Sequence, residues 1–400
     1  MYEERVVSGM RPTGALHLGH FHGALKNWVK LQSEYPCLFF VADWHALTTH
    51  YETPEVIQES VWDMVIDWLA AGIDAAQATL FIQSRIPEHA ELHTLLSMIT
   101  PLSWLERVPS YKDQQEKLID RDLATYGFLG YPLLQAADVL VYRAKYVPVG
   151  EDQVPHIEMT REVARRFNHV YGREPGFEDK AKAAAKKLGS RKAKVVMELR
   201  TKYQEQGDTE ALAAARALLD KQGNLSVADR ERLFGFLEGA GRMILVEPEA
   251  LLTEAPRMPG LDGQKMSKSY NNTITLREDA ESVTKKIRTM PTDPARVKRS
   301  DPGDPDKCPV WQFHLVYSDE KTRQWANQGC RTAGIGCLEC KQPVIDAVLA
   351  EQGPMRERAQ KYLDDPTLVR NIVADGCEKA RKLARETMRE VRGAMGLAYT

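Results

Sequence analysis

Two histidines three residues apart follow the first apolar run of the chain. His17 and His20 lie in residues 11–20, RPTGALHLGH, after a proline and a glycine that end the run. Residues three apart share one helix face, so both imidazoles can donate N–H hydrogen bonds to one phosphate group. A helix start also favours an anion, and Gly19 lets a nucleotide approach the backbone. The spacing indicates a phosphate-binding turn, with plain helix capping as the alternative.

A second short segment has side chains that can hold a triphosphate from the opposite side. Residues 263–269 read GQKMSKS, which places the ammonium groups of Lys265 and Lys268 beside two serine hydroxyls in a loop of small residues. Ammonium groups form strong, charge-assisted hydrogen bonds with phosphate oxygens. Together with the histidines, this loop predicts a site for a nucleoside triphosphate.

These segments need a scaffold that brings them to one edge. Four apolar runs predict strands: residues 6–7, 38–42, 79–82 and 145–149. Helical spacing between them predicts βαβ units, so the fold class is α/β, with a Rossmann-like, doubly wound parallel sheet. Ligands of such sheets lie at the carboxyl ends of the strands, where His17, His20 and His45 all fall.

One acid lies in a helical run that is apolar nearly all round. Residues 131–142 read YPLLQAADVLVY, and an ionised Asp138 is costly there unless a donor meets it. A salt bridge to Arg143 or Arg161 would satisfy it; the functional interpretation is a hydrogen bond from a ligand. Residues 150–153, GEDQ, follow the next strand with polar groups suited to ribose, amino-group or Mg²⁺ contacts, or to plain N-capping by Asp152.

The two segments resemble the paired signature of the class I aminoacyl-tRNA synthetases, and residues 265–269 match its consensus letter for letter. Residues 42–48, 83–84, 87–89, 136–138 and 147–153 are similar to the tryptophanyl-tRNA synthetases. The resemblance is close over residues 5–172 and 256–290. It implies that the carboxylate of L-tryptophan attacks ATP to give tryptophanyl-adenylate, which is then transferred to tRNA(Trp) in protein synthesis. Arg11 and Gln135 depart from many bacterial relatives, which carry Gln and Met there.

The resemblance also implies a role for each site residue. Asp138 would accept the indole N–H, so that specificity over tyrosine follows from the cost of leaving that acid unpaired. The slot for the indole ring would be formed by Val7, His45, Val147 and Val149. Tyr131 and Gln153 would bind the amino and carboxylate groups of tryptophan. Catalytic charge neutralisation would come from His17, His20, Lys265 and Lys268, with Mg²⁺ between the terminal phosphates. ATP would lie on Gly9, Arg11, Pro12, Thr13, Gly19, His20, Gly150, Glu151, Asp152, Met258, Lys265, Met266, Ser267, Lys268 and Ser269.

Four of the six cysteines gather near the end of the chain, at Cys308, Cys330, Cys337 and Cys340. The spacing C-x21-C-x6-C-x2-C resembles that of a subset of tryptophanyl-tRNA synthetases with a [4Fe–4S] cluster near the anticodon site, one residue short in the first gap. Three interpretations stay open: a [4Fe–4S] cluster, a four-cysteine Zn²⁺ site, and four unliganded thiols.

Length and charge bound the organisation of the chain. Its 400 residues with a net charge of −2 support two or three domains and indicate no global attraction to nucleic acid. We expect a cytoplasmic protein without a membrane partner, since the start is charged and no apolar run is long enough to span a bilayer. The expected parts are a Rossmann catalytic domain in two pieces, a helical insertion and a helical anticodon-binding domain: residues 1–172 with 246–290, 173–245, and 291–400. The resemblance implies a homodimer.

The insertion has a strongly basic stretch. Residues 180–202 hold nine basic residues and one acid, Glu198. A solvated pair of charged helices is one interpretation, and contact with the tRNA backbone is the other.

Two other functions compete with tryptophan activation. One is a tyrosine–tRNA ligase of the same architecture. The other is a nucleotidyltransferase or iron–sulfur RNA-binding relative that no longer charges tRNA. The intact signature residues and Asp138 argue against the second, because a retired site needs none of them.

Overall fold

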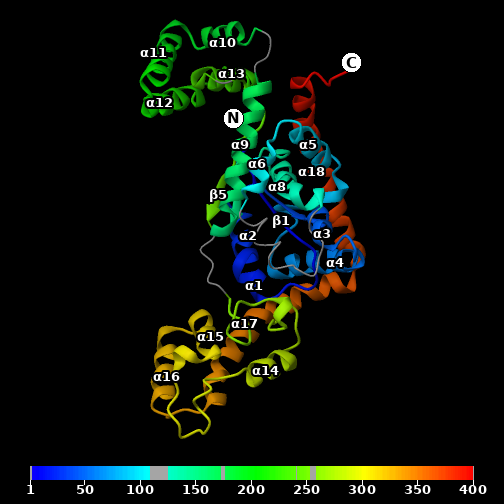
Figure 1. Ribbon diagram of the computed structural model, residues 1–400, viewed down its shortest axis with the longest axis vertical. Coiled ribbons are helices and arrows are strands. Elements are labelled where there is room, and N and C mark those ends of the chain that lie inside the picture. The colour runs from blue at the N-terminus through cyan, green and yellow to red at the C-terminus, as the bar shows by residue number, and fades with distance from the viewer. Residues whose placement is uncertain (1, 109–124, 173–175, 240, 253–257, 400) are drawn as a thin grey trace.

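The computed structural model describes residues 2–108, 125–172, 176–239, 241–252 and 258–399. The molecule is elongated (Figure 1). A parallel sheet lies in its middle, the helices of the insertion lie at one end, and α15 (Pro309–Tyr317) and α16 (Glu320–Arg331) lie at the other.

The sheet has five parallel strands in the order β3-β2-β1-β4-β5. They are β1 (Val6–Met10), β2 (Cys37–Val41), β3 (Ala78–Ile82), β4 (Tyr146–Val149) and β5 (Glu249–Leu252). The four predicted strands and the doubly wound fold are confirmed. The edge strand β5 was not predicted, because its half-exposed residues show no apolar alternation. The strand order reverses between β1 and β4, which is where such sheets bind ligands.

Helices pack around this sheet. The first follows β1 as three continuous pieces, α1 (Leu18–His20), the π-helical η1 (Phe21–Leu25) and α2 (Lys26–Leu31). The others before the insertion are α3 (Asp43–His50), α4 (Glu55–Ala71), α5 (Glu88–Ser97), α6 (Leu102–Glu106), α8 (Tyr126–Leu140) and α9 (Val154–Tyr171), with short 3-10 turns η2 (Gln83–Arg85) and η3 (Glu151–Gln153). Trp28 of α2 stacks on Phe39 of β2 with ring centroids 4.3 Å apart, which joins the helix to the sheet. Among the described helices, none is both long and apolar enough to cross a bilayer.

The insertion forms helices with an apolar core of their own. They are α10 (Phe177–Lys186), α11 (Ser190–Gln206), α12 (Thr209–Asp220) and α13 (Val227–Glu238). Val196, Leu219 and Leu233 are among the buried residues of that core. The basic stretch forms two helices, separated at Gly189, whose φ of +82° a side chain would oppose. Ser226 caps α13 by accepting from the backbone N–H of Asp229.

The last described helices are α14 (Ala280–Thr289), α15 (Pro309–Tyr317), α16 (Glu320–Arg331), α17 (Cys337–Asp364) and α18 (Pro366–Ala394). Two of them, α17 and α18, return to the sheet region. The long helix α17 packs against α4, and α18 packs against β3, at one edge of the sheet. Their buried residues, including Val348 and Val373, belong to the same apolar cluster as the strands.

Gly376 lets α18 approach β3, and this predicts a stability effect. A methyl group on Gly376 would lie 1.9 Å from the carbonyl oxygen of Leu80, which is backbone and cannot rotate away. We expect Gly376→Ala to destabilise the protein by about 1–3 kcal/mol, the usual cost of overpacking, although alanine favours a helix. Gly393→Ala, on the same helix with open space around it, is the control. Equal urea midpoints for the two variants would contradict the prediction.

Candidate functional site

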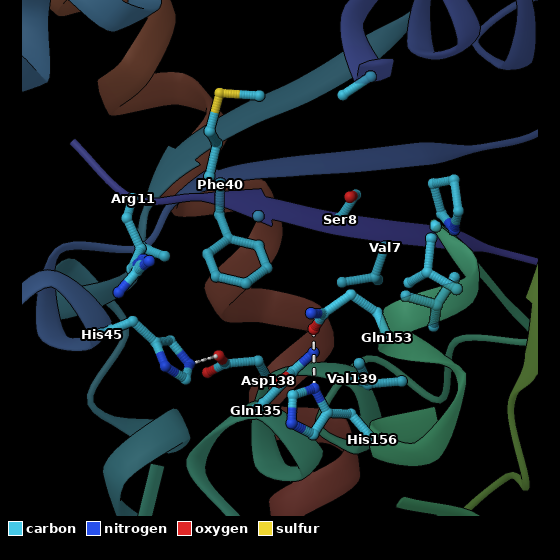
Figure 2. A pocket seen from close by; sticks show the side chains of 18 of the residues that line it. Val7, Ser8, Arg11, Phe40, His45, Gln135, Asp138, Val139, Gln153 and His156 are labelled. Carbon is cyan, nitrogen blue, oxygen red and sulfur yellow. Dashed lines mark hydrogen bonds and ion pairs between the residues drawn. The ribbon is translucent and has the colours of Figure 1, made fainter. Parts of the chain in front are cut away.

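A cavity of about 350 Å³ opens where the strand order reverses, beside the carboxyl ends of β1 and β4 (Figure 2). All seven residues predicted for tryptophan line it: Val7, His45, Tyr131, Asp138, Val147, Val149 and Gln153. Gly9, Arg11 and Gly150, predicted for ATP, line it as well. The structure thus gathers side chains from β1, α3, α8 and β4 around one hollow.

Asp138 lies at this cavity with three hydrogen-bond donors. Its Oδ2 accepts from His45 Nε2 at 2.7 Å. Its Oδ1 accepts from His89 Nδ1 at 2.6 Å and from Gln83 Nε2 at 2.7 Å. Burial acts to raise the pKa of this carboxyl, but the two histidines outweigh it and hold the pKa below its ordinary value. Asp138 is therefore an ionised acid in an apolar helix.

Neither arginine considered as a partner of Asp138 contacts it. Arg143 bonds the carbonyl of Ile244 and pairs with Glu390, whereas Arg161 pairs with Glu158. Instead, His45, Gln83 and His89 supply donors to the acid without any ligand. A carboxylate has about four acceptor positions, and three are taken. Among the described residues no donor takes the fourth position, on Oδ2, which can accept an N–H of a ligand.

The opposite wall carries a second hydrogen-bonded chain. His156 Nδ1 lies 2.7 Å from Gln153 Oε1, and its Nε2 lies 3.3 Å from the Tyr131 hydroxyl. Burial lowers the pKa of His156 to about 4, so the ring is neutral near pH 7. Its Nδ1 then donates to Gln153, and Tyr131 donates to its Nε2. These hydrogen bonds hold the amide of Gln153 and the hydroxyl of Tyr131 in place near the carboxyl end of β4.

His17 and His20 cap the helix that they start. Gly19 N donates to His17 Nδ1 at 3.1 Å, and the backbone N–H of His17 donates to His20 Nδ1 at 3.2 Å. Burial and nearby Lys268 lower the pKa of His17 to about 4; burial, His17 and both lysines lower that of His20 to about 3. Because each Nδ1 accepts, each neutral ring carries its proton on Nε2. Both rings thus cap the helix, and an Nε2–H donor is left on each of them.

The two signature segments meet in space. Lys268 Nζ donates to the carbonyl oxygen of Thr13 at 2.9 Å, and burial lowers the pKa of this lysine. Backbone bridges join His17 to Thr275, and Pro259 to Lys265. The buried Met258 accepts through its carbonyl from the N–H of Met266 at 3.3 Å. The side chain of Ser269 lies outside the described residues.

The remaining predicted ATP residues lie around the two turns. Pro12 and Thr13 follow β1 and are buried or half-buried, while Glu151 and Asp152 lie in η3 after β4. Ser267 is held by its backbone N–H, which donates to Asn272 Oδ1 at 2.8 Å. Two predicted glycines have further reasons to lack side chains. A methyl group on Gly9 would lie 2.4 Å from the Phe40 ring, and one on Gly19 would lie 2.9 Å from the His17 ring.

The four clustered cysteines lie in or next to three helices: Cys308 directly precedes α15, Cys330 lies in α16, and Cys337 and Cys340 lie in the first turn of α17. Burial, followed by the neighbouring thiols of Cys308, Cys330 and Cys337, raises the pKa of Cys340 to about 12. His314 Nε2 lies 3.3 Å from Cys340 Sγ, and the Arg296 guanidinium lies 3.8 Å from Cys330 Sγ. Nevertheless, no three His, Cys, Asp or Glu side chains of the described residues are close enough to form a metal site.

Sequence reasoning missed three residues of this site. Gln83 and His89 hold Asp138, and His156 joins Tyr131 to Gln153. Gln83 directly follows β3, so its place at a carboxyl strand end was a usable signal. His89, on α5, belongs to a segment that resembles the family, but that resemblance gave it no role, and no local pattern marks His156 on α9.

Comparison with known proteins places these features in a family. The family model for the class I tRNA synthetases (W and Y) matches residues 3–188 and 215–350 of the chain. The chain is 74% identical over 400 residues to the tryptophan–tRNA ligase of Ralstonia nicotianae, covering 100% of both chains. It is 42% identical over 397 residues to that of Thermotoga maritima, covering 99% of this chain and 100% of the relative.

A solved structure shares the fold over nearly the whole chain. It is the tryptophanyl-tRNA synthetase of Campylobacter jejuni, complexed with ADP and tryptophan, with a TM-score of 0.73 and 27% identity. The match covers 98% of this chain and 100% of that one.

Proposed function

The chain belongs to the class I tRNA synthetases for tryptophan and tyrosine and works as a tryptophan–tRNA ligase, and we propose that its cavity between β1 and β4 activates tryptophan. The observation that carries this assignment of the site is the position of Asp138. Its carboxylate lies at the cavity with one acceptor position open, and an indole N–H can only donate. Val7, Val147 and Val149 give the apolar walls that an indole ring needs, while His45 contacts Asp138. Tyr131 and Gln153 hold the amino and carboxylate groups.

ATP lies across the turn after β1, between the two signature segments. The Nε2–H groups of His17 and His20 donate to the α-phosphate, and Lys265 and Lys268 neutralise the leaving pyrophosphate. Support comes from the neutral state of both rings and from the contact of Lys268 with Thr13. Gly9, Arg11, Pro12, Gly19, Gly150, Glu151, Asp152 and Met258 complete the ATP site with residues 266, 267 and 269. Mg²⁺, when bound, supplies further neutralisation of the terminal phosphates.

The reaction needs no protein nucleophile. The tryptophan carboxylate attacks the α-phosphorus in line, a bond to the pyrophosphate oxygen breaks, and tryptophanyl-adenylate forms. A ribose hydroxyl of tRNA(Trp) then attacks the activated carbonyl and releases AMP. The protein contributes alignment and charge neutralisation.

Pyrophosphate exchange into ATP tests this function directly. We expect exchange that depends on tryptophan and is at background level with tyrosine. Exchange driven by tyrosine would instead assign a tyrosine–tRNA ligase. Exchange without aminoacylation of tRNA would assign a relative that no longer charges tRNA.

The chain as a whole divides into three proposed units. Residues 1–172 and 246–290 form the catalytic unit, residues 173–245 the insertion, and residues 291–400 the helical unit that reads the anticodon. The separate apolar core of α10–α13 supports the assignment of residues 173–245 as an insertion. The active form is a homodimer, which sedimentation velocity would measure.

We propose that the four clustered cysteines bind a [4Fe–4S] cluster, with Zn²⁺ as the alternative, although in the described residues their thiols are not gathered into a metal site. Support comes from the spacing of the four cysteines along the chain and from their positions in or next to α15, α16 and α17. We expect anaerobically purified protein to be brown and to contain iron and sulfide. Cys340→Ser is expected to lose both, and to lose tRNA charging while it keeps adenylate formation. Cys377→Ala, whose thiol lies on α18, is the control. Colourless protein with zinc and no iron would assign the Zn²⁺ site, and protein with neither metal would contradict both.

A further inference from the structure

A buried histidine two residues after His20 contacts the C-terminal helices. His22 lies in η1 and is 7% exposed. Its Nε2 lies 3.0 Å from Glu351 Oε2 on α17 and 3.1 Å from the Tyr317 hydroxyl on α15. The Tyr317 hydroxyl donates to the same Glu351 oxygen at 2.8 Å. We call these three residues the His22 cluster.

The protonation of the cluster follows from its geometry. A ring nitrogen 3.0 Å from a carboxylate oxygen must carry a proton, because two lone pairs would otherwise face each other. Burial and the charge of Glu351 raise the pKa of Tyr317, so its hydroxyl remains a donor. Glu351 therefore accepts two charge-assisted hydrogen bonds from two different elements, and such bonds are the stronger kind.

The next residue of α17 contacts the segment after the second signature loop. Gln352 is fully buried, and its Nε2 donates to the carbonyl oxygen of Thr275 at 2.6 Å. Thr275 forms the backbone bridge to His17. Two consecutive residues of α17 thus hold both sides of the turn that carries His17 and His20.

The other end of the same helices carries cysteines. Cys337 begins α17 and Cys340 lies in its first turn, about 16 Å along the helix from Glu351 at 1.5 Å per residue. His314, one turn before Tyr317 on α15, contacts the Sγ of Cys340 at 3.3 Å. Both helices therefore connect the cysteines to the His22 cluster.

We propose that the His22 cluster is a positioning site for adenylate formation, through which α15 and α17 hold η1, and with it His17 and His20, where ATP binds. This inference rests on the proposed function and extends it to a residue that contacts no substrate. His22 acts through the turn that precedes it.

Four single variants and one double variant test the proposal in pyrophosphate exchange. His22→Leu and Glu351→Gln are each expected to lower kcat/KM for ATP about tenfold, while the Kd for tryptophan stays unchanged. His22→Gln, which keeps an N–H donor, is expected to stay within about twofold of the unmodified protein. Glu357→Gln is the matched control, with the same chemical change at an exposed position of α17. The double variant His22→Leu with Glu351→Gln is expected to lose no more than either single variant.

Three results would overturn the proposal. His22→Leu could lose no more than the Glu357→Gln control. The losses of the two single variants could add in the double variant. The affinity for tryptophan could fall as much as that for ATP, as a general loss of folded protein would produce. In each case the unmodified protein still shows tryptophan-dependent exchange, so the proposed function stands or falls on a separate measurement.

Discussion

Asp138→Asn is expected to lower kcat/KM for tryptophan by about 10²–10³-fold, because the charge that the buried donors and the indole N–H require is removed. Asparagine has nearly the same shape but offers one acceptor oxygen in place of two. Its amide N–H₂ would also face donors that already point at the carboxylate. Pyrophosphate exchange at varied tryptophan concentration, with ATP saturating, measures the loss.

The effect of Asp138→Asn should be confined to the amino acid. We expect the KM for ATP to change little, since the two signature segments do not contact this carboxylate. Asp179→Asn, at an exposed position of α10, is the control and should behave like the unmodified protein. An unchanged Kd for tryptophan in Asp138→Asn would refute the assigned role. Asp138→Ala should in addition lower the free energy of unfolding by about 3–5 kcal/mol, the typical cost of breaking a buried ion pair.

Lys268→Met is expected to lower kcat for adenylate formation by about 10²–10³-fold, with a smaller change in the KM for ATP. The methionine keeps the length and apolar body of the side chain but has no charge to place on the leaving pyrophosphate. Burial already lowers the pKa of Lys268, so its ammonium has few water molecules to give up when a phosphate arrives. Single-turnover measurement of adenylate formation separates this step from product release.

Lys202→Met, at an exposed position of α11, is the control for the loss of a lysine. It should leave adenylate formation unchanged. A Lys268→Met rate within threefold of the unmodified protein would remove Lys268 from the reaction. Lys265 would then be the remaining cation of the loop.

The parallel sheet and the position of its ligands were predictable because both depend on local patterns. Buried parallel strands are continuous apolar runs, as in β2, and the ends of such strands mark the binding edge. The strand β5 gave no such run, since its residues are half-exposed at the sheet edge. The helix after β1 contains the π-helical turn η1, which helical periodicity in the sequence does not reveal.

The partners of Asp138 were not predictable for a different reason. They come from α3, the turn after β3 and α5, which meet only when the helices have packed. The spacing of residues along the chain does not indicate which helices and turns will pack against one another. The same holds for His22, whose partners Tyr317 and Glu351 lie some 300 residues further along the chain. Local chemistry identified the acid and the two histidines, while tertiary packing decided what supports them.

The packing of α18 against β3 has a consequence for the folding of the chain during its synthesis. Leu80 leaves the ribosome early, but Gly376, which covers it, is made about 300 residues later. Part of the sheet of a nascent chain therefore stays exposed to solvent until Gly376 has been made. Contacts this distant in sequence also form slowly. A chain truncated before Gly376 would keep every signature residue but would have an unfinished core, which chaperones and proteases would recognise.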